Sequence, residues 1–371
     1  MKSILLIIFG AILLSLKSYA QDPFFFNIDQ ARSFYHPSYV ALPRALEINT
    51  SLKNQWPKIP GGFRTAYFGL NYQPCNYFMG FGVYGMLDDK GVGGLKTQMY
   101  GVALRWLLPI KWWAIDHIAV ALPFEYYSKS LTNQDELVFS NEIDQVTGIT
   151  NNNLNPQLLN SGVSFFSSGV SFTFKGEANN VLKKTAPFSV SATWNHLSIG
   201  GPPYERSLQN DNYFVNLHEF FCGTFSMSLE DKNQSVTPRI SMQYQKQSKI
   251  EKITSGGILD FSQENDKASF AIGIYYSTQI RSSNNVKCVS LCPQLQFPIT
   301  EGTLASFCLS YVVGYNNNTT NLPATGAGSI VEATLNLYFL GCNGVFKTPS
   351  IFRQKNIINK NQCPRFGKAS F

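Results

Sequence analysis

The chain contains little charge for its length. Charged residues make up 14% of its 371 residues, whereas a typical soluble domain has about 25%. After the first twenty residues the sequence also lacks long apolar runs. Its mean hydropathy is -0.09, and no later uncharged stretch reaches the roughly 20 residues that a membrane-spanning helix needs. These two shortages argue against a soluble domain of this size and against a helical membrane protein.

Sequence patterns of common catalytic and cofactor sites are also missing. The chain has no Gly-x-Ser-x-Gly elbow and no phosphate-binding or dinucleotide-binding motif. Ser189 and Ser191 lie near His196, but alternation along a strand places the histidine on the opposite face from both serines. We therefore expect no catalytic residue, no cofactor and no enzyme activity.

Metal sites receive no better support. Asp88 with Asp89, and Glu142 with Asp144, are candidate calcium ligands in loops, although solvated loop acids are the simpler interpretation. None of the seven cysteines forms a Cys-x-x-Cys pair, so the spacing fits neither a zinc site nor a dense disulfide scaffold. We expect no metal.

For four of the cysteines the sequence predicts a structural role. Cys288 and Cys292 are four residues apart in a predicted strand, share one face of it, and are interpreted as small wall residues. Cys342 and Cys363 both follow the last predicted strand, and a disulfide between them is compatible with an oxidising periplasm.

The N-terminus reads as a secretory signal peptide. Lys2 supplies a positive charge, residues 4–16 form an apolar region, and small residues precede a predicted cleavage between Ala20 and Gln21. The mature chain is therefore expected to leave the cytoplasm.

The rest of the sequence reads as strands, because apolar and polar residues alternate with period two. Residues 45–56 show this first and residues 331–339 show it last. Fourteen strands are predicted, most of them about 9–14 residues long, as suits tilted strands that cross a bilayer. The twelve between the first and last are 65–73, 76–87, 96–108, 116–129, 162–176, 185–198, 213–230, 236–247, 250–261, 267–280, 286–298 and 303–316. Fourteen is an even number, as bacterial single-chain barrels have.

The connections between these strands alternate in length. Links after even-numbered strands are mostly short, whereas several after odd-numbered strands are long, as at 130–161, 199–212 and 317–330. A short link at 248–249 breaks the pattern. Short turns at one end and long loops at the other are typical of outer-membrane barrels. The predicted fold is an all-β, antiparallel transmembrane barrel of about fourteen strands, with the termini and short turns in the periplasm of a cell outer membrane.

The predicted organisation has four parts. They are a signal peptide at 1–20, an N-terminal segment at 21–44, the barrel at 45–340 and a periplasmic extension at 341–371. The segment 21–44 either folds into the lumen as a plug or docks on a periplasmic partner, and the sequence leaves both open. The extension does not alternate, so a chain without it is expected to fold into a barrel.

Composition also limits the partners. The formal net charge is only +7, with basic residues concentrated near the C-terminus. Nucleic acid is an improbable partner for an exported barrel, whereas lipid phosphates or an acidic partner fit a basic tail.

Trp56, Trp106, Trp112 and Trp113 are expected to form interfacial aromatic girdles.

Several short motifs stand out along the chain. Asn54-Gln55-Trp56-Pro57 is the most specific and is followed by Pro60-Gly61. Asp88-Asp89 with Gly91 comes next, in a predicted loop, and Cys363-Pro364-Arg365-Phe366 lies near the end. In order and spacing over about the first 145 residues, and in this ending, the chain resembles the PorP/SprF family of Bacteroidetes outer-membrane proteins, which is tied to type IX secretion and gliding motility.

The resemblance implies a non-enzymatic barrel. Its expected partners are outer-membrane lipid and type IX components of the translocon or periplasmic ring, or one large adhesin for which it serves as the secretion and surface-attachment partner. A channel for small or lipidic solutes is the alternative, and a soluble extracellular adhesin is a third reading.

Overall fold

The computed structural model describes the strands and one stretch ahead of them. The described residues are 24–39, 46–57, 62–73, 78–91, 94–108, 114–131, 162–181, 184–197, 204–206, 214–216, 220–229, 236–247, 250–262, 268–280, 286–300, 303–316 and 329–339. The predicted signal peptide and the extension from 341 lie outside them. Within the described residues, no helix is long and apolar enough to cross a membrane.

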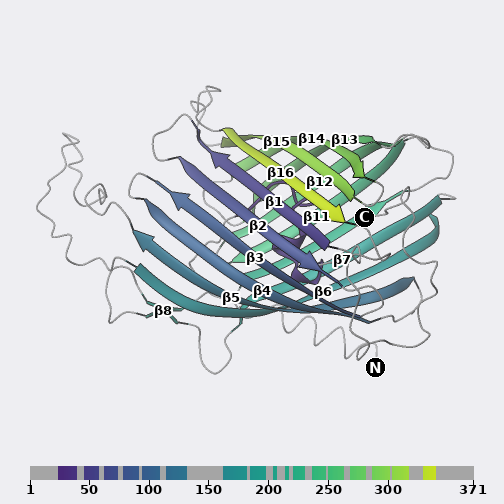
Figure 1. The fold of residues 1–371 in the computed structure, drawn as a ribbon. Helices are drawn as coiled ribbons and strands as arrows, with labels where there is room; N and C mark the ends of the chain where they lie inside the picture. Colours follow the sequence, from purple (N-terminus) through teal and green to yellow (C-terminus); the bar gives the residue numbers. More distant parts are fainter. Residues whose placement is uncertain are drawn as a thin grey trace, which may run out of the picture.

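Fourteen of the described strands form one closed antiparallel barrel (Figure 1). They are β1 (Leu46–Gln55), β2 (Phe63–Tyr72), β3 (Met79–Lys90), β4 (Leu95–Leu108), β5 (Ile115–Leu131), β6 (Gly162–Val181), β7 (Lys184–Leu197), β10 (Phe220–Ser228), β11 (Val236–Gln247), β12 (Ile250–Ser262), β13 (Ser269–Gln279), β14 (Val286–Thr300), β15 (Thr303–Asn316) and β16 (Ser329–Phe339). Each pairs with its neighbours in chain order. The predicted fold class and strand number are confirmed.

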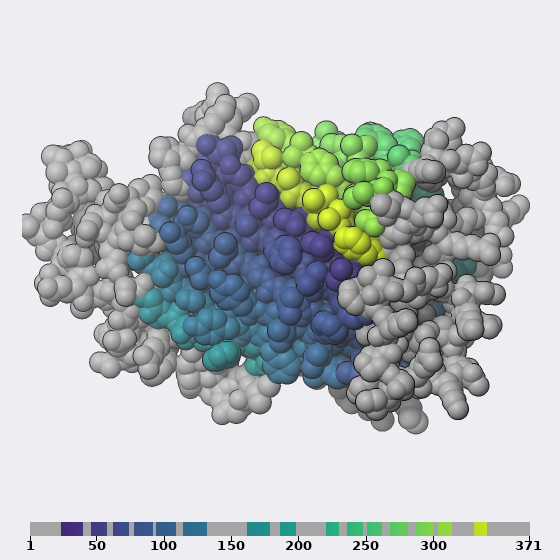
Figure 2. All heavy atoms as spheres, viewed as in Figure 1, coloured from purple at the N-terminus to yellow at the C-terminus, as the bar shows by residue number. Residues whose placement is uncertain are grey.

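The first and last strands close the wall. β1 pairs with β16 and with β2 along all ten of its residues, from Leu46 opposite Phe339 to Gln55 opposite Ile330. Figure 2 shows the yellow side chains of β16 lying directly against the purple side chains of β1. Because every strand has two partners, the barrel leaves no sheet edge with unpaired backbone groups, as a structure within lipid requires.

Alternation along each strand gives the wall two different faces. In β3, for example, Met79, Phe81, Val83 and Leu87 are exposed, with Phe81 and Val83 48% and 43% accessible, while Tyr84 and Met86 are buried toward the lumen. Exposed side chains elsewhere on the outer face are mainly Leu, Ile, Val and Phe. An apolar outer band of this kind is what a bilayer requires of a barrel wall.

Charge on the outer face is confined to its borders. Among the barrel strands, the charged residues at outward positions whose side chains are described each lie second from an end of their strand. They are Arg64, Asp89, Lys96, Asp116, Lys246, Glu251 and Lys287. Charged side chains are costly at the bilayer midplane and tolerated near its interfaces, so their placement marks the two edges of the apolar band.

Two sequence expectations about elements are wrong. The predicted strand 213–230 is two elements: β9 (Phe214–Asn216) pairs with β8 (Tyr204–Arg206) outside the barrel sheet, and only β10 enters the wall. The predicted loop around Asp88 and Asp89 is also strand, because β3 runs on to Lys90. In both places the composition of the sequence suggested a boundary, but the boundary of a strand is decided by its pairing with a neighbouring strand.

Candidate functional site

The lumen is lined by polar side chains. Buried positions on the inner face include Asn49 and Ser51 of β1, Thr173 of β6 and Gln243 of β11. Many bond to one another across strands; Asn49 Nδ2, for example, donates to Asn336 Oδ1 at 3.0 Å. In a barrel whose outer face is apolar, such a lining would ordinarily be wetted by water in an open channel.

A stretch of the chain itself, in place of water, fills the lumen against this lining. Residues Phe24–Tyr39, hereafter the lumenal segment, contain the helix α2 (Arg32–Tyr35) and the 3-10 turn η1 (Pro37–Tyr39). Phe25, Ile28, His36 and Ser38 are all at most 1% accessible. The segment is the purple element inside the strands in Figure 1. Its contacts, described next, reach wall strands on all sides of the lumen.

Aromatic packing holds the first part of the lumenal segment. Phe34 lies edge-on to Phe25 at 5.1 Å and to Tyr67 of β2 at 5.2 Å between ring centroids. Tyr35 Oη donates to the Phe25 carbonyl at 2.7 Å and lies 2.5 Å from its amide nitrogen. Edge-to-face pairs add to the area that such rings bury, so the segment contributes an apolar cluster of its own within a polar lumen.

A buried ion pair holds the middle. Arg32 and Asp29 form a salt bridge one helical turn apart. The Asp29 carboxylate also accepts from Ser241 Oγ at 3.0 Å and from Tyr275 Oη at 2.7 Å. Burial by itself raises the pKa of Asp29, but Arg32, the more distant Arg239 and the hydrogen bonds lower it more, so the net shift is downward. Asp29 is therefore an anion tied to β11 and β13.

His36 ties the segment to the next two strands of the wall, β10 and β7, which follow β11 in the barrel. Its Nδ1 lies 2.7 Å from Thr193 Oγ1 of β7 and its Nε2 lies 2.6 Å from Thr224 Oγ1 of β10. Burial, with the nearby Arg32 cation, lowers the pKa of His36 to about 3. The imidazole is therefore neutral, with one nitrogen donating and the other accepting.

Ser38 and Tyr39 complete the attachment on that side. Ser38 Oγ lies 2.7 Å from Ser171 Oγ and 2.6 Å from Thr173 Oγ1, both on β6. Tyr39 Oη donates to Ser189 Oγ of β7 at 2.8 Å. Together with His36, these bonds satisfy hydroxyl groups that would otherwise need water.

Glu332 of β16 binds the start of the segment through its backbone. Its two carboxylate oxygens accept from Phe26 N at 2.9 and 2.8 Å, and one of them accepts from Asn27 N at 3.2 Å. Lys53 Nζ donates to the Phe24 carbonyl at 2.6 Å, and Lys252 Nζ lies 3.4 Å from the centroid of the Phe24 ring. The segment therefore meets charged wall residues of both signs.

Asn27 meets a disulfide. Cys292 of β14 and Cys308 of β15 form this bond between neighbouring strands, and Asn27 Nδ2 lies 3.2 and 2.8 Å from the two sulfurs. Cys288 faces the lumen as a free thiol. The interpretation of Cys292 as a plain wall residue is therefore incomplete, since it also cross-links the wall; Cys342 and Cys363 lie outside the described residues.

The family-motif residues lie away from this segment. Asn54 and Gln55 end β1, and Trp56, with its positive φ of 58°, and Pro57 follow it. The Trp56 ring lies tilted against that of Phe63, with 4.9 Å between centroids, just past the end of β1; the aromatic girdle expected there stays a prediction. Residues 20, 21, 60, 61, 112, 113 and 363–366 are outside the described residues, as are Glu142 and Asp144.

Asp88 and Asp89 point to opposite faces of β3. Asp88 is buried in the lumen, where Thr65 Oγ1 donates to it at 2.6 Å and Lys90 Nζ lies 2.8 Å away, whereas Asp89 is exposed outside. They cannot converge on one ion, so the candidate calcium pair is not formed. Within the described ranges, no group of three His, Cys, Asp or Glu side chains is arranged to hold a metal.

The expected placement of His196 is wrong. Asn195 and His196 are both buried on the lumenal side, because His196 has a positive φ of 61° at an irregular point in the β6–β7 pairing. His196 Nδ1 lies 2.8 Å from Ser167 Oγ. A bulge of this kind shifts the alternation by one residue, which a period-two reading cannot foresee.

The residues that hold the lumenal segment were not singled out from the sequence. Asp29, Arg32 and His36 lie in a stretch without strand alternation, and the sequence offered only its position ahead of the barrel and the run Phe24-Phe25-Phe26. One usable signal was present: Asp29 and Arg32 have the spacing of an ion pair on a helical turn.

Several solved structures are similar to the chain. The Ralstonia pickettii toluene transporter TbuX is 11% identical, with 88% of this chain and 100% of that chain covered at a TM-score of 0.48. The CymD monoaromatic hydrocarbon channel is 9% identical, covering 85% of this chain and 93% of that one at 0.46. A Pseudomonas aeruginosa FadL homologue is 9% identical, covering 85% and 94% at 0.46. Such distant similarities carry no argument about function.

Sequence comparison identifies the family. No curated protein matches the chain. The profile of the family described as type IX secretion system membrane protein PorP/SprF matches residues 17–335, which include the lumenal segment and all of the barrel except the end of β16. Because this match covers most of the sequence, the chain belongs to the PorP/SprF family of type IX secretion system membrane proteins.

Proposed function

We propose that this protein is a non-enzymatic barrel of the bacterial outer membrane that is plugged by its own lumenal segment and acts by binding other proteins. Its partners are type IX secretion components, either the translocon or the periplasmic ring, or one large adhesin that it helps to secrete and anchor at the surface. The short links and both chain termini face the periplasm.

The observation that carries the proposal is the occupied lumen. Asp29, His36 and Ser38 bond to the arc of wall strands from β13 to β6, and the backbone at Phe26 bonds to Glu332 of β16, outside that arc. A channel for small polar solutes needs a continuous water-filled path, whereas these contacts replace water along the lining. With the lumen closed, binding at the two ends and along the outer wall is the means of action left to the barrel.

A channel for small or lipidic solutes is the alternative. It would require the lumenal segment to leave the lumen and expose the Asp29–Arg32 pair and the Phe25–Phe34 cluster, both now buried. Asp29, His36 and Ser38 are held by buried hydrogen bonds and, for Asp29, an ion pair, which makes that movement costly. We therefore favour the binding role.

Affinity purification tests the binding role. The tagged chain would be extracted from outer membranes in mild detergent, with a tagged, unrelated outer-membrane barrel from the same cells as the control, and the co-purifying proteins would be identified by mass spectrometry. We expect type IX components or one very large surface protein that are missing from the control.

A protein that is purified alone, and that conducts ions in a planar bilayer, would overturn the proposal in favour of the channel. A protein that is purified alone but does not conduct would retain the plug and refute the binding role.

A further inference from the structure

A hollow lies on the outer face of the wall across the seam where the barrel closes. It has a volume of about 440 Å³ and crosses β16, β1, β2 and β3. Its floor is a row of cross-strand neighbours: Ala333 lies opposite Leu52, Leu52 opposite Ala66, and Ala66 opposite Leu87. We name this hollow the seam groove.

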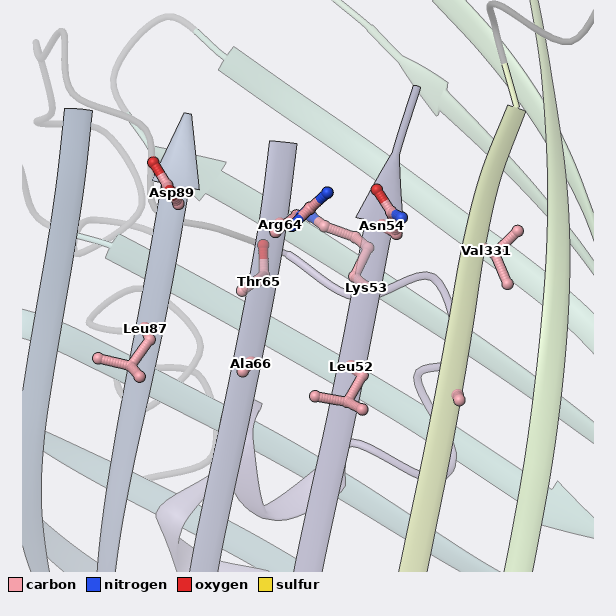
Figure 3. Close-up of a pocket in the computed structure, with 10 residues that line it drawn as sticks. Leu52, Lys53, Asn54, Arg64, Thr65, Ala66, Leu87, Asp89 and Val331 are labelled. Atoms are coloured by element: carbon pink, nitrogen blue, oxygen red, sulfur yellow. The ribbon is translucent and has the colours of Figure 1, made fainter. Parts of the chain in front are cut away.

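Side-chain size makes the groove. Leu52 and Leu87 are exposed, at 53% and 52%, and between and beside them stand the small side chains of Ala66 and Ala333. Figure 3 shows Ala66 on β2 between Leu87 on β3 and Leu52 on β1. Large and small side chains alternate along this row, so apolar space opens over Ala66 and Ala333 beside the two leucines.

A polar row lies above this floor, nearer the strand ends. Asn54 lies opposite both Val331 and Arg64, Arg64 lies opposite Asp89, and Asp89 lies opposite Lys96. In Figure 3 the Arg64 side chain extends toward β1, on which Asn54 stands. Arg64 and Lys96 outnumber Asp89, so the row is net positive at the edge of the apolar band.

We propose that the seam groove is a binding site for a phosphate-bearing membrane lipid, with one acyl chain along Leu52, Ala66 and Leu87 and the phosphate at Arg64. A guanidinium binds phosphate through two parallel N–H bonds, and the Asn54 amide supplies a further donor. The groove is continuous with the lipid-facing band, so an acyl chain enters it without crossing a polar barrier. The site is independent of the binding role proposed for the whole barrel.

Native mass spectrometry tests the site. The full chain in mild detergent would be titrated with phosphatidylglycerol and, separately, with diacylglycerol, which has the same acyl chains and no phosphate. We expect the wild type to bind phosphatidylglycerol at least fivefold more tightly than diacylglycerol. Arg64→Gln should abolish this preference, and Ala66→Trp should weaken the binding of both lipids at least fivefold by filling the groove.

Two matched variants keep the test specific. Lys287→Gln removes a cation from the equivalent second position of β14, and Val190→Trp adds the same ring to the outer face of β7. Both should bind lipid like the wild type. Heat-modifiable migration would confirm that each variant is a folded barrel, and Ala333→Trp replaces Ala66→Trp if the latter fails to fold.

Three results would overturn the proposal. They are equal binding of the two lipids by the wild type, unchanged binding in the folded tryptophan variant, and an equal loss in Lys287→Gln or Val190→Trp.

Discussion

The two faces of one wall are stabilised in different ways. Outward residues such as Val102 and Ile274 are apolar and 48% and 56% exposed, and they require only that their surroundings be apolar. Inward residues such as Thr193 and Thr224 meet one particular partner, the His36 ring, at hydrogen-bond distance. The outer face therefore tolerates exchange among apolar side chains, whereas the inner face requires specific pairs.

This difference bears on function. An outer face that tolerates exchange makes a generic membrane anchor. An inner face that is matched residue by residue to the lumenal segment has a fixed occupant, as expected of a plugged barrel. Substitutions on the outer face should therefore change the stability of the barrel in the membrane, whereas substitutions on the inner face should change how firmly the lumenal segment is held.

Cys222 can report release of the lumenal segment. Its thiol is fully buried, 3.8 Å from His36 Nε2.

The largest effect is expected at the buried ion pair. Asp29→Asn leaves the Arg32 guanidinium buried without its anion, at a cost of about 3–5 kcal/mol. The segment should then leave the lumen far more often. Maleimide labelling of Cys222, in a chain whose other unpaired cysteines are serine, should accelerate by about two orders of magnitude or more.

The double variant Asp29→Asn/Arg32→Gln is the control for that result. It removes both charges and should restore a large part of the protection of Cys222. Labelling of Asp29→Asn at the wild-type rate would show that the pair does not hold the segment.

A charge in the middle of the outer face comes next. Val102→Arg places a cation on the lipid-facing side near the centre of β4, which costs about 2–4 kcal/mol of unfolding free energy at the bilayer midplane. Urea unfolding in lipid vesicles, followed by tryptophan fluorescence, measures it. Val102→Leu should change stability by less than about 1.5 kcal/mol, and an equally small effect of the arginine would mean that this face does not meet lipid.

Acidification should loosen the segment by a smaller amount. The pKa of His36 is about 3 when it is docked and about 6.5 when it is free. The released state therefore binds the extra proton below pH 6.5, and docking is lost as the pH falls from there toward 3. Between pH 7.5 and 5.5 the loss is about 1.4 kcal/mol. It should appear as a roughly tenfold rise in Cys222 labelling once each rate is divided by that of a free cysteine peptide at the same pH, because only the thiolate reacts.

His36→Gln should remove most of this pH dependence over the same range. Asp29 does not contribute there, because its pKa is lowered from 3.8 and it titrates only in more acidic solution. Labelling that accelerates equally in His36→Gln would assign the effect to another group.

The smallest effect is expected from one hydroxyl. Ser38→Ala removes two hydrogen bonds to β6 and should cost about 0.5–1.5 kcal/mol of docking free energy. The same Cys222 labelling should rise by a few-fold. Thr173→Val, which removes one of the two partners from the wall side, should give a similar increase, and no change in either variant would mean that water replaces the bond.

The sequence predicted the wall better than its contents, and the reason is physical. Alternation reports which face of a strand meets which environment, and it needs no knowledge of a partner, so β1 and β16 were located closely. The Cys292–Cys308 bond depends on the register of two strands, and the His196 placement depends on one bulge. Neither leaves a periodic trace in the sequence.

The lumenal segment is harder still. Phe24–Tyr39 has no period, and its conformation is set by partners from β1 to β16 that come together only when the barrel closes. Local propensity would not place Asp29 beside Tyr275. The two readings that the sequence left open for this stretch could be separated only by contacts in three dimensions.

Planar-bilayer conductance tests the central claim most directly, with the full chain compared against a chain that lacks residues 24–39. The account predicts that the full chain stays closed and that the shortened chain, verified as a folded barrel by heat-modifiable migration, opens steady ohmic channels through its polar lumen. Equal conductance of the two would contradict it, because the lumenal segment would then not be what closes the barrel.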